Sequence, residues 1–134
     1  DYDAKLAETS EQLGVIVEAL ASAGVDIFDV STRVFSLPAF SGSDMGLAGW
    51  VRKLSGKPTM TVGGIGFDKE LAASFAQPTH AIDNLSEVVR RFGGEEFDLV
   101  ALGRALLMDP AWVVKAQAGK PFEPFDISSY SRLD

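Results

Sequence analysis

The sequence predicts an α/β fold that is built from about three βα units with parallel strands. Three short apolar runs begin near Val25, Thr59 and Phe97, and stretches with helical periodicity lie between them. The runs start roughly 35 residues apart, which is the length of one strand with its crossover helix. Three strands are too few for a complete eight-stranded barrel. We therefore expect a single domain over residues 1–134 with the architecture of a half-barrel.

Composition and charge exclude several classes of protein. The 134 residues fit one domain, and 46% of them are hydrophobic, which is enough for a core. The absence of cysteine excludes disulfides and thiolate chemistry and favours a cytoplasmic protein. A net charge of −7, with 12 scattered basic residues, argues against nucleic-acid binding. No apolar run reaches the roughly 18 residues that a membrane helix needs. The chain begins with Asp1 rather than methionine, so we expect a fragment or a missing beginning.

The first helix is predicted to begin after Thr9, which would act as its cap while Gln12 reaches back. Its apolar face has helical spacing and contains Leu13, Val17, Leu20 and Ala21. Gly24 is expected to end this helix. Residues 25–31 then predict a short strand, because branched and aromatic residues dominate them despite two aspartates.

A long irregular stretch, residues 32–46, leads into the second unit. Loops of this length in a compact domain are usually functional or disordered. A short helix over residues 47–54 is expected next, closed by Gly56. The second strand is predicted over residues 58–63.

Two further helices are predicted between the second and third strands. Asp68 is expected to cap the first of them, which runs through residue 75 and is ended by Pro78. Residues 84–87 have the pattern of a capping box with Asn84 as the cap. The buried face of this second helix would contain Leu85, Val88, Val89 and Phe92. Gly93 and Gly94 close it.

The third unit begins with a strand over residues 97–102. Asp109 followed by Pro110 is a strong signal for a helix start, with the aspartate as cap. The inward face of this last helix would contain Trp112, Val113 and Ala116. Gly119 ends the helix, and the tail from Lys120 is expected to lie along the surface.

Two neighbouring strand ends carry the candidate binding site. The second strand stops at Gly63 and Gly64, and the third stops at Gly103 and Arg104. Glycine lets the backbone approach a ligand closely, and exposed amides together with a guanidinium suit a phosphate group. In a plainer interpretation, which stays open, the glycines only turn the chain and Arg104 pairs with a surface carboxylate. The pattern predicts that these four residues bind the phosphate of a cofactor.

Other polar residues offer no comparable site. His80 is the only histidine and lies far from the strand ends, which favours a surface or packing role. Asp26 and Asp29 would point to opposite sides of a strand, so they do not form an acid/base pair. Arg33 could reach a substrate anion or simply be solvated, and residues 41–44 could rim a pocket or form a flexible turn. We predict no catalytic residue and no metal site.

Three motifs carry a resemblance to a known family. They are Val62-Gly63-Gly64-Ile65, the run from Phe97 to Leu107, and Asp109-Pro110-Ala111-Trp112-Val113 followed by Gly119. Together they are similar to the C-terminal part of the old yellow enzyme family, the flavin-dependent NAD(P)H oxidoreductases. Residues 24–26 and 30–31 also resemble the sixth strand of that family. The similarity covers residues 10–126, and its most specific part is residues 103–112.

The resemblance implies the C-terminal part of a TIM (β/α)8 barrel that binds FMN at the C-terminal ends of its strands. Residues 25–31, 59–63 and 97–103 would correspond to strands six, seven and eight. The FMN phosphate would be held by the amides of Gly63, Gly64, Gly103 and Arg104 and by the Arg104 side chain. The family's substrate-anchoring His/His or His/Asn pair and its tyrosine acid come from the first five strands. His80 does not match that pair, so the resemblance places no catalytic residue in this chain.

The expected function is therefore the C-terminal portion of an FMN-dependent NAD(P)H oxidoreductase of the ene-reductase type. NAD(P)H would be the reductant and a small molecule the electron acceptor. One alternative is a non-catalytic assembly module, because the open edges of a half-barrel need the missing N-terminal half or a second copy. Another is a phosphate-binding barrel for a different phosphorylated ligand. Neither nucleic acid nor a membrane is expected as a partner.

Overall fold

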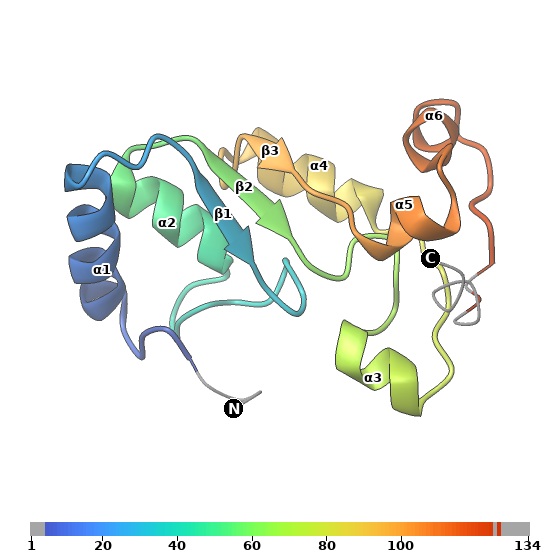
Figure 1. Cartoon of the computed structure of the whole chain (residues 1–134), viewed down its shortest axis with the longest axis horizontal. Coiled ribbons are helices and arrows are strands. Elements are labelled where there is room, and N and C mark those ends of the chain that lie inside the picture. Colours follow the sequence, from blue (N-terminus) through green and yellow to red (C-terminus); the bar gives the residue numbers. More distant parts are fainter. Residues whose placement is uncertain (1–4, 125, 127–134) are drawn as a thin grey trace.

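The computed structural model describes residues 5–124 and residue 126. Helices and strands alternate along the chain (Figure 1). They are α1 (Ser10–Ser22), β1 (Phe28–Ser31), α2 (Leu47–Ser55), β2 (Thr59–Val62), α3 (Leu71–Ala76), α4 (Leu85–Gly93), β3 (Leu99–Val100), α5 (Arg104–Met108) and α6 (Trp112–Gln117). The fold is thus mixed α/β, as the sequence predicts.

The strands form one parallel sheet in the order β1-β2-β3. Phe28 of β1 lies opposite Thr59 of β2, and Leu99 of β3 lies opposite Met60. The prediction of parallel βα units is confirmed in this form, with strands shorter than expected. β1 begins three residues late because Val25 donates its amide to the carbonyl of residue 20, which completes the C-terminal turn of α1.

One face of the sheet is covered, and the register decides which residues lie on it. Val30, Thr59 and Thr61 are buried, and the strands that carry them pack against α2. Asp29 and Ser31 alternate with these residues, point to the opposite face and are exposed. Helix α1 packs on α2, while α5 and α6 lie at the other end of the molecule (Figure 1).

Helix α1 begins as predicted. The Thr9 hydroxyl accepts a hydrogen bond from the Gln12 amide at 3.3 Å, and the Gln12 carboxamide reaches back to the amide one residue before the cap. Leu13 and Val17 are buried, as expected. Leu20, which the spacing places on the same apolar face, is 45% exposed. The helix packs on α2, and this contact buries only part of the predicted apolar face.

Helix α3 has a different cap from the predicted one. The Glu70 carboxylate accepts hydrogen bonds from the amides of Ala72 and Ala73, both at 2.8 Å. Asp68 instead accepts from the amide of His80 at 2.8 Å, across the base of the segment that contains α3. The longer side chain of Glu70 can reach two amides of the first turn, so Asp68 is not needed there.

The predicted capping box of α4 is wrong. Asn84 precedes the helix but makes no side-chain bond to its first turn. The Asp83 carboxylate accepts from the Leu85 amide instead, at 3.1 Å. The Asn84 carboxamide binds the backbone of Gly64 and Gly66 instead, and Glu87 pairs with two arginines.

The buried face of α4 also differs from the prediction. Val88 is buried, but Val89 and Phe92 are 67% and 53% exposed. The position that faces the interior in their place is Arg91, at 4% exposure. Counting only apolar side chains therefore assigns the wrong face, because a charged residue can occupy an inner position when it finds enough hydrogen-bond partners.

Arg91 finds these partners in the long loop between β1 and α2. Its guanidinium donates to the carbonyl oxygens of Ser36 at 2.8 Å and Asp44 at 3.0 Å, and it pairs with Glu96 at 2.8 Å. Glu96 also accepts from the amide of Gly46 at 3.1 Å. The predicted irregular stretch is therefore held by a buried ion pair that the sequence alone did not reveal.

Acid should weaken the fold through Glu87. Hydrogen bonds from Arg90 and then Arg91 lower the pKa of its carboxyl from 4.5 to about 2. Because the pKa is depressed in the folded chain, this stabilisation is present above pH 4.5 and is lost as the pH falls towards 2. We expect the urea midpoint of the wild type to drop below pH 4.5, and that of Glu87→Gln to drop less steeply. Glu18→Gln, at an exposed position of α1, should follow the wild type.

The last helix begins later than predicted. Asp109 accepts a hydrogen bond from the amide two residues on, at 3.1 Å, and pairs with Lys115 at 2.7 Å, but α6 starts at Trp112. Trp112 is buried as expected, whereas Val113 is exposed. Phe122 stacks on the Trp112 ring at 4.7 Å between centroids. The predicted course of residues 125 and 127–134 lies outside the described residues.

Candidate functional site

A pocket of about 180 Å³ lies at the C-terminal ends of β2 and β3. All four residues that the sequence singles out line it: Gly63, Gly64, Gly103 and Arg104. Leu71 of α3 forms another part of the wall. The two glycine-bearing strand ends therefore meet in space, as expected from neighbouring strands of a parallel sheet.

Gly63 is required by the close approach of two chain segments. A Cβ atom at this position would lie 2.1 Å from the carbonyl oxygen of Thr32, and the φ of Gly63 is +136°. Both conditions exclude an ordinary L side chain. The Thr32 amide and hydroxyl each donate to the Val62 carbonyl at 3.0 Å, which continues the pairing of β1 with β2 up to the pocket.

The carbonyl groups at the end of β2 are bound by protein donors. The Gly63 carbonyl accepts from the Phe35 amide at 2.9 Å. The Gly64 carbonyl accepts from the Asn84 carboxamide at 2.9 Å and from the Phe67 amide at 3.3 Å. With the Val62 carbonyl, three consecutive carbonyl oxygens are therefore occupied by the protein.

The matching amides point the other way. All peptide bonds of the described chain are trans, so each N–H is directed opposite to the carbonyl of its own peptide plane. The amides that follow these three carbonyls belong to Gly63, Gly64 and Ile65. Within residues 5–124, none of the three donates to another protein atom. We call these three N–H groups the amide cradle. Consecutive amides of this kind can bind an anion, and the three residues that carry them line the pocket.

The end of β3 adds a further amide to the pocket. The Gly103 N–H also has no acceptor among the described residues, while its carbonyl accepts from the amides of Leu106 and Leu107. A Cβ at Gly103 would meet no atom within 4 Å. Local packing therefore does not demand glycine here, in contrast to Gly63.

The Arg104 side chain is directed to the segment that carries α3. Its guanidinium donates to the hydroxyl of Ser74 and to the carbonyl of Lys69, the latter at 2.9 Å. It also lies over the Phe67 ring, 4.6 Å from the centroid. Both of these acceptors are neutral oxygen atoms, and Arg104 itself lines the pocket.

Two other predicted candidates lie away from this pocket. His80 is 72% exposed at its side chain and contacts Asp68 at 3.2 Å, which agrees with a surface role. The hydrogen bond from the His80 amide is the main cause of the lowered pKa of Asp68. Asp26 and Asp29 are both exposed, and only Asp29 belongs to β1. Neither set of residues forms an acid/base pair at the strand ends.

A larger cavity, of about 650 Å³, lies beside the C-terminal end of β1. Arg33 lines it, together with mostly apolar residues of the following loop such as Leu37 and Phe40. Of the predicted rim, residues 41–44, none lines this cavity. The Ser43 hydroxyl closes a local turn instead, by accepting from the Met45 amide at 3.2 Å.

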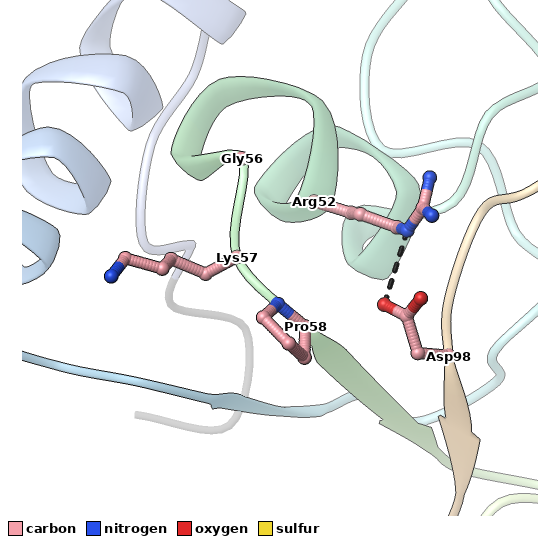
Figure 2. A pocket seen from close by; sticks show the side chains of 5 residues that line it. All are labelled: Arg52, Gly56, Lys57, Pro58 and Asp98. Atoms are coloured by element: carbon pink, nitrogen blue, oxygen red, sulfur yellow. Dashed lines mark hydrogen bonds and ion pairs between the residues drawn. The ribbon is translucent and has the colours of Figure 1, made fainter.

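A third hollow, of about 290 Å³, lies at the N-terminal ends of the strands, beside the start of β2 (Figure 2). Arg52 donates to the carboxylate of Asp98 at 3.1 Å, and the same carboxylate accepts from the Thr59 amide at 2.9 Å. The bond from Arg52 lowers the pKa of Asp98. In Figure 2 the Lys57 side chain points away from this pair. The polar groups of the hollow thus fasten β3 to α2 and the start of β2.

The described residues contain neither a metal-binding cluster nor a membrane-spanning helix. Across residues 5–124 and residue 126, no three histidine, aspartate or glutamate side chains gather in a way that could hold a metal ion. In the same part of the chain, every helix is too short or too polar to cross a membrane.

The sequence reasoning missed one residue that lines the pocket, Ile65, and one that binds the turn beside it, Asn84. Ile65 supplies a backbone amide, which any residue except proline could supply, so its side chain gives no signal. Asn84 has the pattern of a helix cap, and only the three-dimensional structure shows its carboxamide at the glycine turn. Comparison with models of known protein families gave no match to this chain, and comparison with curated protein sequences gave no significant match.

Proposed function

We propose that this chain is the C-terminal portion of an FMN-dependent NAD(P)H oxidoreductase and that it supplies the phosphate site of the flavin. The observation that supports this proposal is the amide cradle of Gly63, Gly64 and Ile65, with the Gly103 amide in the same pocket. Backbone amides with no protein acceptor are suitable donors to the oxygens of a phosphate monoester.

The fold supports the same proposal. In barrel enzymes, phosphate groups are often bound by the loops after the seventh and eighth strands, at the C-terminal face. The pocket lies at the C-terminal ends of the two neighbouring parallel strands β2 and β3. We propose that β1, β2 and β3 are strands six to eight of a TIM barrel, in line with the resemblance to the old yellow enzyme family.

The residues of this chain would bind and orient the cofactor rather than react with it. The cradle would hold the phosphate, and the positive charge of Arg104 would favour the dianion from the side of α3. FMN, when bound, supplies hydride transfer from NAD(P)H to an electron-poor acceptor. No residue of the pocket is proposed as a catalytic acid or base.

A comparison of FMN with riboflavin tests the proposal, because the two ligands differ only in the phosphate. We expect FMN to bind at least about tenfold more tightly than riboflavin, which corresponds to about 1.4 kcal/mol. Inorganic phosphate should compete with FMN. The measurement is a titration followed by flavin fluorescence, with equilibrium dialysis as a second readout.

Two arginine variants test whether the preference for FMN over riboflavin arises in this pocket. Arg104→Ala should weaken the binding of FMN and leave that of riboflavin unchanged. Arg90→Ala removes the same charge from an exposed position of α4, where Arg90 contacts Glu87, and should change neither affinity. Equal affinities for FMN and riboflavin would refute the phosphate site. Binding of phosphate without any preference for the flavin would favour the alternative of another phosphorylated ligand.

One observation favours the second candidate, an assembly module. Leu99 and Val100 of β3 are 48% and 37% exposed, although parallel strands are normally covered on both faces. Among the described residues, β1 and β3 are both edge strands. We propose that, in this case, the β3 edge of one copy continues the sheet beside the β1 edge of a second copy. Sedimentation velocity at micromolar concentration separates the candidates, because a stable monomer contradicts the assembly module.

A further inference from the structure

Asn84 fastens the turn that follows β2 at two points. Its Nδ2 donates to the carbonyl of Gly64, and its Oδ1 accepts from the amide of Gly66, both at 2.9 Å. The half-buried carboxamide thus makes the two bonds that a neighbouring backbone would make. A helix cap needs only an acceptor, so the use of both the donor and the acceptor sets this asparagine apart.

The peptide that joins Gly64 to Ile65 needs such a restraint. Gly64 and Gly66 have φ values of +67° and +84°, and glycine gives the backbone access to many other conformations. The other donor to the Gly64 carbonyl, the Phe67 amide, is 3.3 Å away and is the longer bond. If this peptide plane turned over, the Ile65 N–H would leave the cradle and a carbonyl oxygen would replace it.

We infer that Asn84 is the positioning residue of the amide cradle. By holding the Gly64 carbonyl, it keeps the N–H of Ile65 directed away from that carbonyl and available to an anion. Asn84 itself does not line the pocket, so it acts through the backbone. The identity of the anion, a phosphate monoester, rests on the proposed function, whereas the orientation of the amide does not.

The experiment compares Asn84→Ala with Asp83→Ala. The Asp83 carboxylate accepts from the Leu85 amide at the start of α4, so its loss weakens the helix without touching the turn. Removing its negative charge cannot weaken the binding of an anion. The φ angles of Gly64 and Ile65 are measured in the free protein from the three-bond couplings between their amide and α protons, because the φ of Ile65 changes when the Gly64–Ile65 peptide plane turns over. FMN and inorganic phosphate are then titrated into each variant.

We expect Asn84→Ala to change the Ile65 coupling and to weaken the binding of FMN and phosphate at least about tenfold. Asp83→Ala should lower the thermal midpoint but leave the couplings and both affinities unchanged. If the alanine variant does not fold, Asn84→Asp keeps the acceptor for Gly66 and replaces the donor to Gly64 with an acceptor oxygen. Because it also adds a negative charge near the pocket, only its Ile65 coupling is compared, and not its affinities. It should then show the same change in the Ile65 coupling.

The outcomes separate this inference from the proposed function. An unchanged Ile65 coupling in the folded Asn84 variants overturns the positioning role, whatever the affinities are. Unchanged affinities for FMN and phosphate in a variant whose coupling has changed also overturn it. A wild-type chain that binds neither ligand refutes the proposed function, while an altered coupling in Asn84→Ala still supports the positioning role.

Discussion

Replacing Arg91 with methionine is expected to destabilise the chain by about 3–5 kcal/mol. The substitution keeps a side chain of similar length but leaves Glu96, which is 12% exposed, without its counter-charge. The carbonyl oxygens of Ser36 and Asp44 also lose a donor. The loop between β1 and α2 would then lose its attachment to α4. Urea unfolding followed by circular dichroism measures the change.

Arg90 provides the matched control on the same helix. Arg90 and Arg91 both pair with the Glu87 carboxylate. The Arg90 side chain is 53% exposed, so Arg90→Met should lower the free energy of unfolding by less than about 1 kcal/mol. Both variants remove one positive charge, and they differ in burial and in the number of loop contacts. A similar loss of stability in the two variants would show that the buried pair is not what holds the loop.

Gly63→Ala is expected to have the second large effect, a loss of more than about 4 kcal/mol or a failure to fold. The added Cβ would lie 2.1 Å from the Thr32 carbonyl oxygen, and the nearest atoms include the backbone of β1's extension rather than a flexible side chain. Relief requires the segment around Thr32 to move, which breaks its two hydrogen bonds to the Val62 carbonyl. Thermal unfolding of the purified variant measures the loss.

Gly24→Ala is the control that distinguishes the cost of a positive φ from the cost of the steric clash with Thr32. Gly24 also has a positive φ, +100°, but a Cβ there would meet no atom within 4 Å. Only the conformational cost remains, roughly 1–2 kcal/mol. If Gly24→Ala and Gly63→Ala lower the midpoint equally, the contact with Thr32 is not the reason that Gly63 is required.

Local signals in the sequence located most of the elements. The Thr9 cap, the stop at Gly56 and the strand before Gly63 are each encoded by a few adjacent residues, and the structure contains them where they are predicted. These features depend on local conformational preference, which neighbouring residues determine. The alternation of strands and helices follows in the same way and is sufficient for the parallel sheet.

Interactions between distant residues were not predictable in the same way. The burial of Arg91 depends on carbonyl groups of Ser36 and Asp44, about fifty positions earlier in the chain, and nothing near Arg91 in the sequence indicates them. Val89 and Phe92 fit an apolar face by spacing, but they are largely exposed, and the Phe92 ring only approaches the Phe97 ring, at 6.2 Å between centroids. A hydrophobic pattern gives the period of a helix but not the elements that surround it.

The candidate site was predictable in its location and less so in its chemistry. Glycines at neighbouring strand ends indicate where a backbone can approach a ligand, and the pocket forms there. The contacts of Arg104 with Ser74 and Lys69 were not foreseen, because α3 had to be placed first.

The side chain and the backbone amide of Ile65 have different roles, so they constrain the sequence differently. Its side chain is 5% exposed and belongs to the hydrophobic core, whereas its N–H belongs to the cradle. Mutation can exchange the side chain among apolar types of similar volume without altering the donor, and only proline removes it. Diverging sequences could therefore change the residue type at position 65 and keep the backbone donor that it supplies.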